Sequence, residues 1–324
     1  MLLGITDEKL LMKLNKRLSD ALLPYATFTG KRTIIFPSGS RDEIVYYSDE
    51  LKMWWHFSDV RKERYWNCFG VDNPNDAKKI NITCEINMPF RGVNLRTAGM
   101  WAENVEGKYI ILHNGSIRGG QKGVGKSLFR THYKGEWAKV KIDKKQYTYA
   151  PVAQLDDDKL PYQIRQFVRG VREIKDLAKS MRKGGFRDGK YNPEFSGTKR
   201  YDLPDEVVAN CNHGIVVDSL QRAIEALGYR ANNTTIIDLY TQAKGGIVNR
   251  IFEVKTALSR QTVYTAIGQL KLNSIPHKHS KLYFVSPNTI NKELINDLQN
   301  LGIMTILYVW KDKLPEFINL KELI

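Results

Sequence analysis

The hydrophobic residues of the chain follow helical spacing in two stretches of the N-terminal half. Leu10, Leu11, Leu14 and Leu18 recur every three or four residues, which predicts an amphipathic helix over residues 1–24. The same spacing predicts a second helix over residues 160–183, carried by Ile164, Phe167, Val168, Val171 and Ile174.

Between residues 32 and 155 the pattern changes to short β-like runs separated by Gly, Asn and Asp. Many short strands with such punctuation are typical of a barrel-like or sandwich-like module. The runs are residues 33–39, 43–49, 78–87, 107–115, 137–143 and 147–155.

A polar segment rich in Gly and Pro, residues 184–204, has no sustained apolar period and is interpreted as a linker. Its basic residues suit either contact with a nucleic-acid backbone or simple solvation. We therefore predict two domains: a β-rich recognition domain flanked by helices at residues 1–183, and a second domain at residues 205–324.

The second domain alternates helices with strands, which predicts an α/β fold with a central mixed sheet. A helix over 205–227 ends at Gly228, a residue that favours helix termination. The remaining expected elements are strands at 234–240, 250–256, 281–286 and 304–310, and helices at about 261–272 and 291–302.

The net charge of the chain indicates which class of partner it binds. Its 324 residues carry a formal net charge of +15, with a pI near 9.5. Such a surplus favours a polyanion, with nucleic acid as first candidate and an anionic membrane surface as second. No run approaches the roughly 20 apolar residues of a membrane span, and the N-terminus lacks the apolar core of a signal peptide. The dispersed Cys68, Cys84 and Cys211 match no zinc spacing, and idle thiols fit a cytoplasmic protein.

One hairpin-like segment carries candidate chemistry. Asp238 and Glu253 are equidistant from the pair Gly245–Gly246, so a tight glycine turn would place them opposite one another on antiparallel strands. Opposed residues have Cβ atoms roughly 4.5–5.5 Å apart, a separation that one divalent ion can bridge. Lys255 lies two residues after Glu253 and therefore on the same face of its strand.

Two opposed carboxylates repel unless a cation lies between them. Oxygen ligands of this kind suit Mg²⁺, which Mn²⁺ can replace, better than zinc. A bound metal would activate water, and Lys255 would orient it and offset the charge of the transition state. The alternative for the isolated residues is a solvated strand face with an ion pair between Glu253 and Lys255.

The arrangement resembles the PD-(D/E)XK, or restriction-endonuclease-like, nuclease superfamily over roughly residues 204–324. Ile237-Asp238 and Glu253-Val254-Lys255 stand as its signature, although the usual proline before the first acid is absent. Gly268-Gln269-Leu270 is similar to a glutamine motif of several branches, which implies that Gln269 supports Lys255. The resemblance implies a Mg²⁺-dependent endodeoxyribonuclease that leaves a 5′-phosphate.

Some branches of that superfamily take a further metal-binding acid from the first helix. Asp218 and Glu225 are the candidates here, and a solvated helix face is the alternative for both. His213 opens the same helix and is within reach of the site, but a capping or surface role is the interpretation we favour.

Residues 120–127, GQKGVGKS, match the phosphate-loop pattern. The segment that follows alternates like a strand instead of forming the required helix, so we do not expect a nucleotide-binding loop. Arg118, Lys122 and Lys126 suit contact with a DNA backbone. A solvated hairpin loop is the alternative.

Residues 54–70 interleave aromatic side chains with the cations Arg61, Lys62 and Arg64. Aromatic rings can stack on flipped bases while cations hold phosphates. The tryptophans are candidates either for a base pocket or for the core, and they are Trp54, Trp55, Trp66 and Trp101.

The resulting hypothesis is a two-domain restriction endonuclease, either sequence-specific or dependent on base modification, acting on double-stranded DNA. One active site cuts one strand, so duplex cleavage would use a homodimer or sequential nicking. The open alternatives are a structure-specific repair or recombination nuclease, a non-catalytic DNA-binding protein, and a nucleotide-hydrolysing motor.

Overall fold

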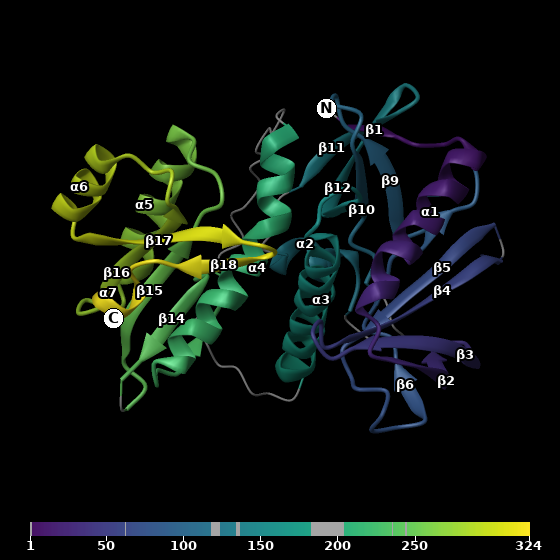
Figure 1. The fold of residues 1–324 in the computed structure, drawn as a ribbon, viewed down its shortest axis with the longest axis horizontal. Coiled ribbons are helices and arrows are strands. Elements are labelled where there is room, and N and C mark those ends of the chain that lie inside the picture. The colour runs from purple at the N-terminus through teal and green to yellow at the C-terminus, as the bar shows by residue number, and fades with distance from the viewer. Residues whose placement is uncertain are drawn as a thin grey trace. The chain divides into compact units, whose positions relative to one another are not determined.

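The computed structural model describes residues 2–61, 63–117, 124–133, 137–182, 204–234, 236–243 and 245–324. The described chain is mixed α/β and falls into two compact units, Met1–Val208 and Ala209–Ile324 (Figure 1). The predicted linker, residues 184–204, lies outside the described residues except for Pro204, which begins a helix. No described helix is both long and apolar enough to cross a membrane.

A closed five-stranded barrel forms one part of the first unit, with strand order β1-β11-β12-β10-β9. Its strands are β1 (Leu2–Gly4), β9 (Gly99–Glu103), β10 (Tyr109–His113), β11 (Ala138–Ile142) and β12 (Lys145–Gln154). The helix predicted for residues 1–24 is therefore wrong at its start, because β1 pairs in parallel with β11 and buries Leu2 in the barrel. Helix α1 (Glu8–Leu22) begins only after Asp7, whose carboxylate accepts from the Leu10 amide at 2.7 Å.

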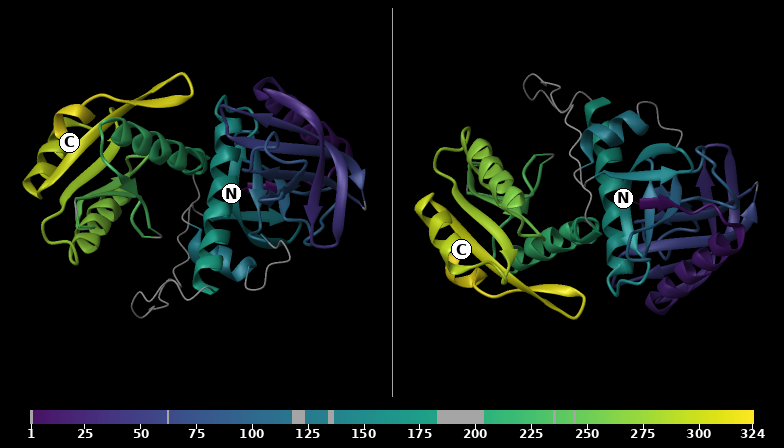
Figure 2. Two further views of the ribbon diagram at one scale, coloured as in Figure 1. Left: turned by 90° about the horizontal axis from the view of Figure 1, so that it is seen from below. Right: turned by 90° about the horizontal axis from the view of Figure 1, so that it is seen from above.

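A second, curled sheet has the order β6-β2-β3-β4-β5-β7. We predicted no strand over residues 54–70, yet these residues form most of two neighbouring strands of this sheet, β4 and β5. The strands are β2 (Phe28–Phe36), β3 (Gly39–Ser48), β4 (Met53–Arg61), β5 (Arg64–Gly70), β6 (Lys79–Asn81), β7 (Cys84–Glu85) and β8 (Met88–Pro89), the last of which pairs with β5. The helical elements of this unit are α1, the short 3₁₀ helix η1 (Leu23–Tyr25), α2 (Lys126–His132) and α3 (Leu160–Arg182), which matches the helix predicted for 160–183 (Figure 2).

The second unit is built on a six-stranded mixed sheet in the order β13-β14-β15-β16-β17-β18. The strands are β13 (Ala231–Asn232), β14 (Leu239–Gln242), β15 (Val248–Val254), β16 (Lys281–Pro287), β17 (Ile303–Lys311) and β18 (Leu314–Phe317). The strand expected at 234–240 begins only at Leu239, because the Thr234 hydroxyl accepts from the amides of Ile236 and Ile237 and makes a turn there.

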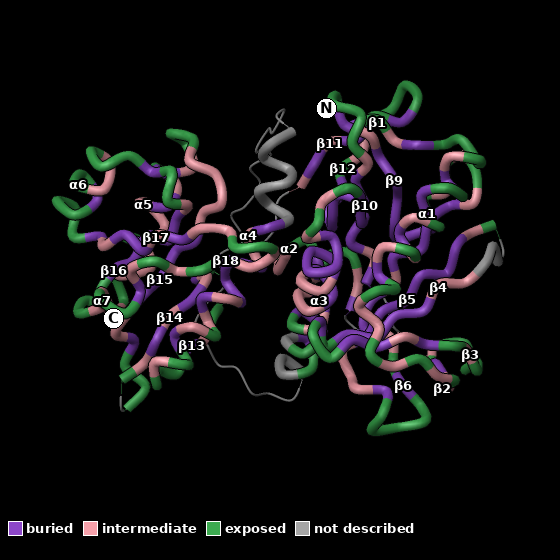
Figure 3. The backbone as a smooth tube through the Cα atoms, viewed as in Figure 1, coloured by how far each residue is buried: buried purple, intermediate pink, exposed green. Residues whose placement is uncertain are grey.

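Helices pack on both faces of this sheet. Apolar side chains of α4 (Pro204–Ala226) and α7 (Leu320–Leu323) meet one face, where Phe252 and Val254 are buried. Those of α5 (Arg260–Ser274) and α6 (Lys292–Asn300) meet the other face, where Ile251 and Phe284 are buried. The strands of this unit are accordingly its most buried part (Figure 3).

Candidate functional site

The hairpin β14–β15 has the register expected for Asp238 and Glu253. Leu239 pairs with Phe252, and the same register carried back by one residue sets Asp238 opposite Glu253. The expected two-residue turn is wrong, however, because the strands end at Gln242 and begin again at Val248. A bulge shifts the pairing next to Thr241 and so compensates for the longer connection.

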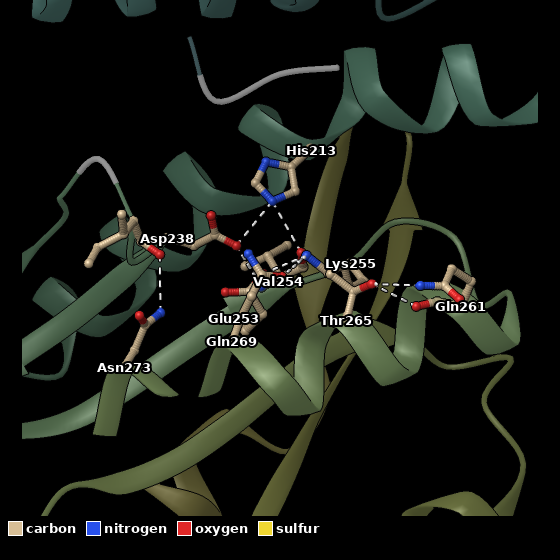
Figure 4. Close-up of polar contacts among 10 residues, drawn as sticks. His213, Asp238, Glu253, Val254, Lys255, Gln261, Thr265, Gln269 and Asn273 are labelled. Carbon is tan, nitrogen blue, oxygen red and sulfur yellow. Dashed lines mark hydrogen bonds and ion pairs between the residues drawn. The ribbon is translucent and has the colours of Figure 1, made fainter. Parts of the chain in front are cut away.

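Lys255 follows directly after β15 and is bound on two sides. Its amine donates to Glu253 Oε1 at 2.5 Å and to Gln269 Oε1 on α5 at 3.1 Å (Figure 4). Its main-chain amide donates to Val285 of β16 at 2.9 Å, so the sheet fixes its backbone. Gln269 thus has the contact with Lys255 that the resemblance implied.

The carboxylate of Asp238 has different partners. Its Oδ2 accepts from the Val254 amide at 2.9 Å and lies 3.1 Å from His213 Nε2 on α4. The same imidazole nitrogen lies 3.1 Å from the Val254 carbonyl oxygen. The interpretation of His213 as a cap or surface residue is therefore wrong: it is the α4 side chain that contacts Asp238 (Figure 4).

The surroundings of Asp238 and Glu253 shift the pKa values of the two carboxyl groups in opposite directions. Burial alone would raise the pKa of Asp238, but the charges of His213 and Lys255 and the Val254 amide outweigh it and hold that pKa well below its usual range. Burial, together with the nearby Asp238 charge, raises the pKa of Glu253 to about 7 despite Lys255. Near neutral pH the pair therefore holds one firmly ionised carboxylate and one that titrates.

Three atoms beside Asp238 have spacings that can be compared with those of metal ligands. Adjacent ligands of an octahedral ion with bonds of about 2.1 Å stand about 3.0 Å apart. His213 Nε2 has that spacing, 3.1 Å, to both Asp238 Oδ2 and the Val254 oxygen. Glu253 can add a second carboxylate, because only its Oε1 is engaged by a partner among the described residues.

The described residues nevertheless contain no group of three or more His, Cys, Asp or Glu side chains arranged as a metal cluster. Glu253 faces Lys255, and Val254 offers a main-chain oxygen instead of a side chain. Full coordination would thus require Glu253 to share its carboxylate between the amine and the ion.

The two acids proposed from the first helix both lie on α4. Asp218 is buried, five residues after His213. Glu225 is exposed and accepts from Gln221 Nε2 at 3.4 Å.

Few of the predicted DNA-contacting cations lie within the described residues. Arg118 and Lys122 are outside them, as is the side chain of Arg61. Arg64 begins β5 and is half-buried, whereas Lys126 is exposed at the start of α2.

Helix α2 itself corrects the strand-like interpretation of the segment after the phosphate-loop pattern. It is seven residues long and buries only Phe129. The ring centroid of Phe129 lies 5.8 Å from that of His113 and 5.8 Å from that of Trp137.

The tryptophans proposed for a base pocket belong to the core. Trp54 and Trp101 are fully buried, Trp55 is 1% exposed and Trp66 is 7% exposed. The Trp66 indole donates to Glu85 Oε1 at 2.7 Å, so its polar edge is already used. In this structure these rings do not line an accessible pocket.

Sequence and structure comparisons identify no relative. No protein-family model, no curated protein and no solved structure matches this chain significantly.

Proposed function

We propose that the protein is a metal-dependent endonuclease that hydrolyses phosphodiester bonds of double-stranded DNA, with its active site in the second unit. One observation carries the proposal: Asp238, Glu253 and Lys255 lie together on one hairpin, and Glu253 is buried, so its ion pair with Lys255 is not part of a solvated strand face. His213 and Gln269 brace this group from α4 and α5. The net charge of +15 supports a polyanionic substrate.

The residues of the site would have different roles in hydrolysis. When bound, Mg²⁺ or Mn²⁺ would polarise the phosphodiester and lower the pKa of a bound water. His213, Asp238, Glu253 and the Val254 carbonyl would hold the ion. Lys255 is positioned to orient the attacking water and to offset charge that develops on the phosphate.

Gln269 acts through Lys255 and is therefore a positioning residue. Its Oε1 accepts from the amine at 3.1 Å and restricts the long side chain to the neighbourhood of Glu253. Without this contact the amine would sample other rotamers, and fewer molecules would hold the water in line for attack.

A restriction enzyme, sequence-specific or modification-dependent, is the biology that we favour. One such site cuts one strand, so duplex cleavage would use two copies of the chain or two successive nicks. A structure-specific repair nuclease would share the site but would cut branched DNA without a fixed sequence.

The test is cleavage of plasmid and of modified and unmodified genomic DNA with Mg²⁺ and without ATP. We expect Asp238→Ala and Lys255→Ala to abolish cleavage. The controls Asp297→Ala and Lys292→Ala, exposed on α6, remove the same charges at a distance and should cut like wild type. Wild-type cleavage by both site variants would refute the proposed site, and strict dependence on ATP would refute the proposed reaction.

A further inference from the structure

The hairpin β11–β12 of the first unit gathers lysines that have no acidic partner. Lys139 and Lys141 lie on β11, and Lys144 and Lys145 lie at or beside the turn. None of them makes an ion pair with a residue in the described part of the chain. Six other lysines of this unit do pair with acids: Lys16, Lys31, Lys52, Lys108, Lys159 and Lys179.

The pairing of the strands shows which side chains share the outer face of the barrel. Val140 and Ile142 are buried in the barrel, so Lys139 and Lys141, which alternate with them, point outward. Lys139 is opposite Thr148, and Lys141 is opposite Gln146. The outer face of the hairpin therefore carries two cations, each beside an uncharged hydrogen-bonding side chain.

The nearest acids do not neutralise this face. Asp143 is in the turn itself, at φ +52°, and makes no ion pair within the described residues. Leu3 of β1 pairs with Lys141 on one side and with Glu103 of β9 on the other. The backbones of Glu103 and Lys141 are therefore two strand spacings, about 9.6 Å, apart. The lysines repel one another at some cost in stability, and no ion pair within the described residues offsets it.

The spacing suits the backbone of a nucleic acid. Residues two apart on a strand are about 6.6–6.8 Å apart, a separation at which two lysines can each contact a different phosphate of one DNA strand. Lysine, threonine and glutamine side chains are common donors to phosphate oxygens. Among the outward residues of this face that the structure describes, Leu3 is the exposed apolar one, at 52%. A membrane-binding surface would carry several such side chains.

We propose that the outer face of the β11–β12 hairpin binds the phosphate backbone of duplex DNA. This inference deepens the proposed function and rests on DNA being its substrate. The contact is independent of sequence: it holds the duplex on the first unit and leaves base recognition to other residues.

The test measures binding of the full-length protein to a 30-base-pair duplex in EDTA, over a range of salt concentrations. The slope of log affinity against log salt is negative, and each lost phosphate contact reduces its magnitude by about 0.9. Lys139→Gln/Lys141→Gln should thus reduce the magnitude of the slope by about 1.8. Between 50 and 200 mM salt, wild type should lose about twelve times more affinity than this variant does.

Two further variants make the result specific. Lys9→Gln/Lys13→Gln removes the same charge from exposed positions of α1 and should keep the wild-type slope. Lys139→Arg/Lys141→Arg keeps the positive charge on the hairpin and should also keep the wild-type slope. An unchanged slope in the glutamine variant, or an equal fall in the α1 variant, overturns the proposal.

Vesicles of phosphatidylcholine and phosphatidylserine form the second arm. If the hairpin variant loses vesicle binding but keeps its slope on DNA, the surface binds membranes and the proposal is wrong. Because these measurements contain no metal and no cleavage, failure here leaves the nuclease proposal intact. Conversely, cleavage by the Asp238 and Lys255 variants would refute the nuclease site without affecting the binding result.

Discussion

The buried carboxylate of Glu253 should make the metal-free protein less stable as the pH rises. Glu253 is 2% exposed, and burial with the Asp238 charge raises its pKa from 4.5 to about 7. In that interval the folded protein keeps a proton that the unfolded chain has lost, so stability falls as pH rises from 4.5 to 7 and stays low above it. A shift of this size corresponds to about 3 kcal/mol, with the Lys255 attraction already included.

Glu253→Gln removes the ionisation and keeps an oxygen for Lys255. We therefore expect the variant to be about 3 kcal/mol more stable than wild type at pH 8 in EDTA, and equally stable near pH 4. Asp238 does not disturb the comparison, because its lowered pKa keeps it ionised throughout the window. Hydrogen exchange of the β15 amides, measured by mass spectrometry from pH 4 to 8, reports this unit separately from the first.

Addition of Mg²⁺ should reverse the order of stability. At a thousand times its dissociation constant, a ligand stabilises the folded state by about 4.1 kcal/mol, which exceeds the difference of about 3 kcal/mol, and only wild type keeps both acids to bind it. The reasoning fails if the variant is no more stable than wild type at pH 8 in EDTA, or if the difference between them does not depend on pH.

Three further outcomes are expected. Mg²⁺ affinity, measured by calorimetry, should rise about tenfold per pH unit up to pH 7 and then level off, because Glu253 must lose its proton; a flat profile from pH 5.5 to 8 would contradict its raised pKa. His213→Ala should weaken metal binding by about 10–100-fold, and unchanged affinity would exclude the imidazole from the site. Gly70→Ala should destabilise the first unit by about 1–3 kcal/mol in melting experiments, since a Cβ there would lie 2.2 Å from the buried Trp54 Nε1. Gly268→Ala, with open space around it on α5, is the matched control and should not destabilise the protein.

The hairpin of the candidate site was predictable because strand pairing follows simple arithmetic. The equal distances of Asp238 and Glu253 from two glycines gave the right register, although the turn is longer than two residues. The bulge was not predictable, since it depends on how the chain closes beyond Gln242. Gln269 was identified from the motif Gly268-Gln269-Leu270, and its contact with Lys255 agrees with the supporting role that the motif implied.

Other features depend on contacts that no local pattern contains. His213 reaches Asp238 only because α4 packs across the face that buries Val254, and the expectation that His213 opens this helix is wrong, since α4 begins at Pro204. Val254 contributes a carbonyl oxygen, which side-chain patterns do not indicate. The aromatic residues of β4 and β5 were ambiguous because stacking platforms and β-sheet cores use the same side chains.

The bulge next to Thr241 has a consequence for changes in chain length. Glu253 is held by β16 on its other side, so β15 cannot slide when residues are added to the hairpin tip. Gly245, Gly246 and Ile247 are exposed, and a strand pair that already contains one supernumerary residue can redistribute another. The tip is therefore a suitable position for inserting a peptide tag or a fluorophore while the end of the hairpin that carries Asp238 and Glu253 keeps its alignment.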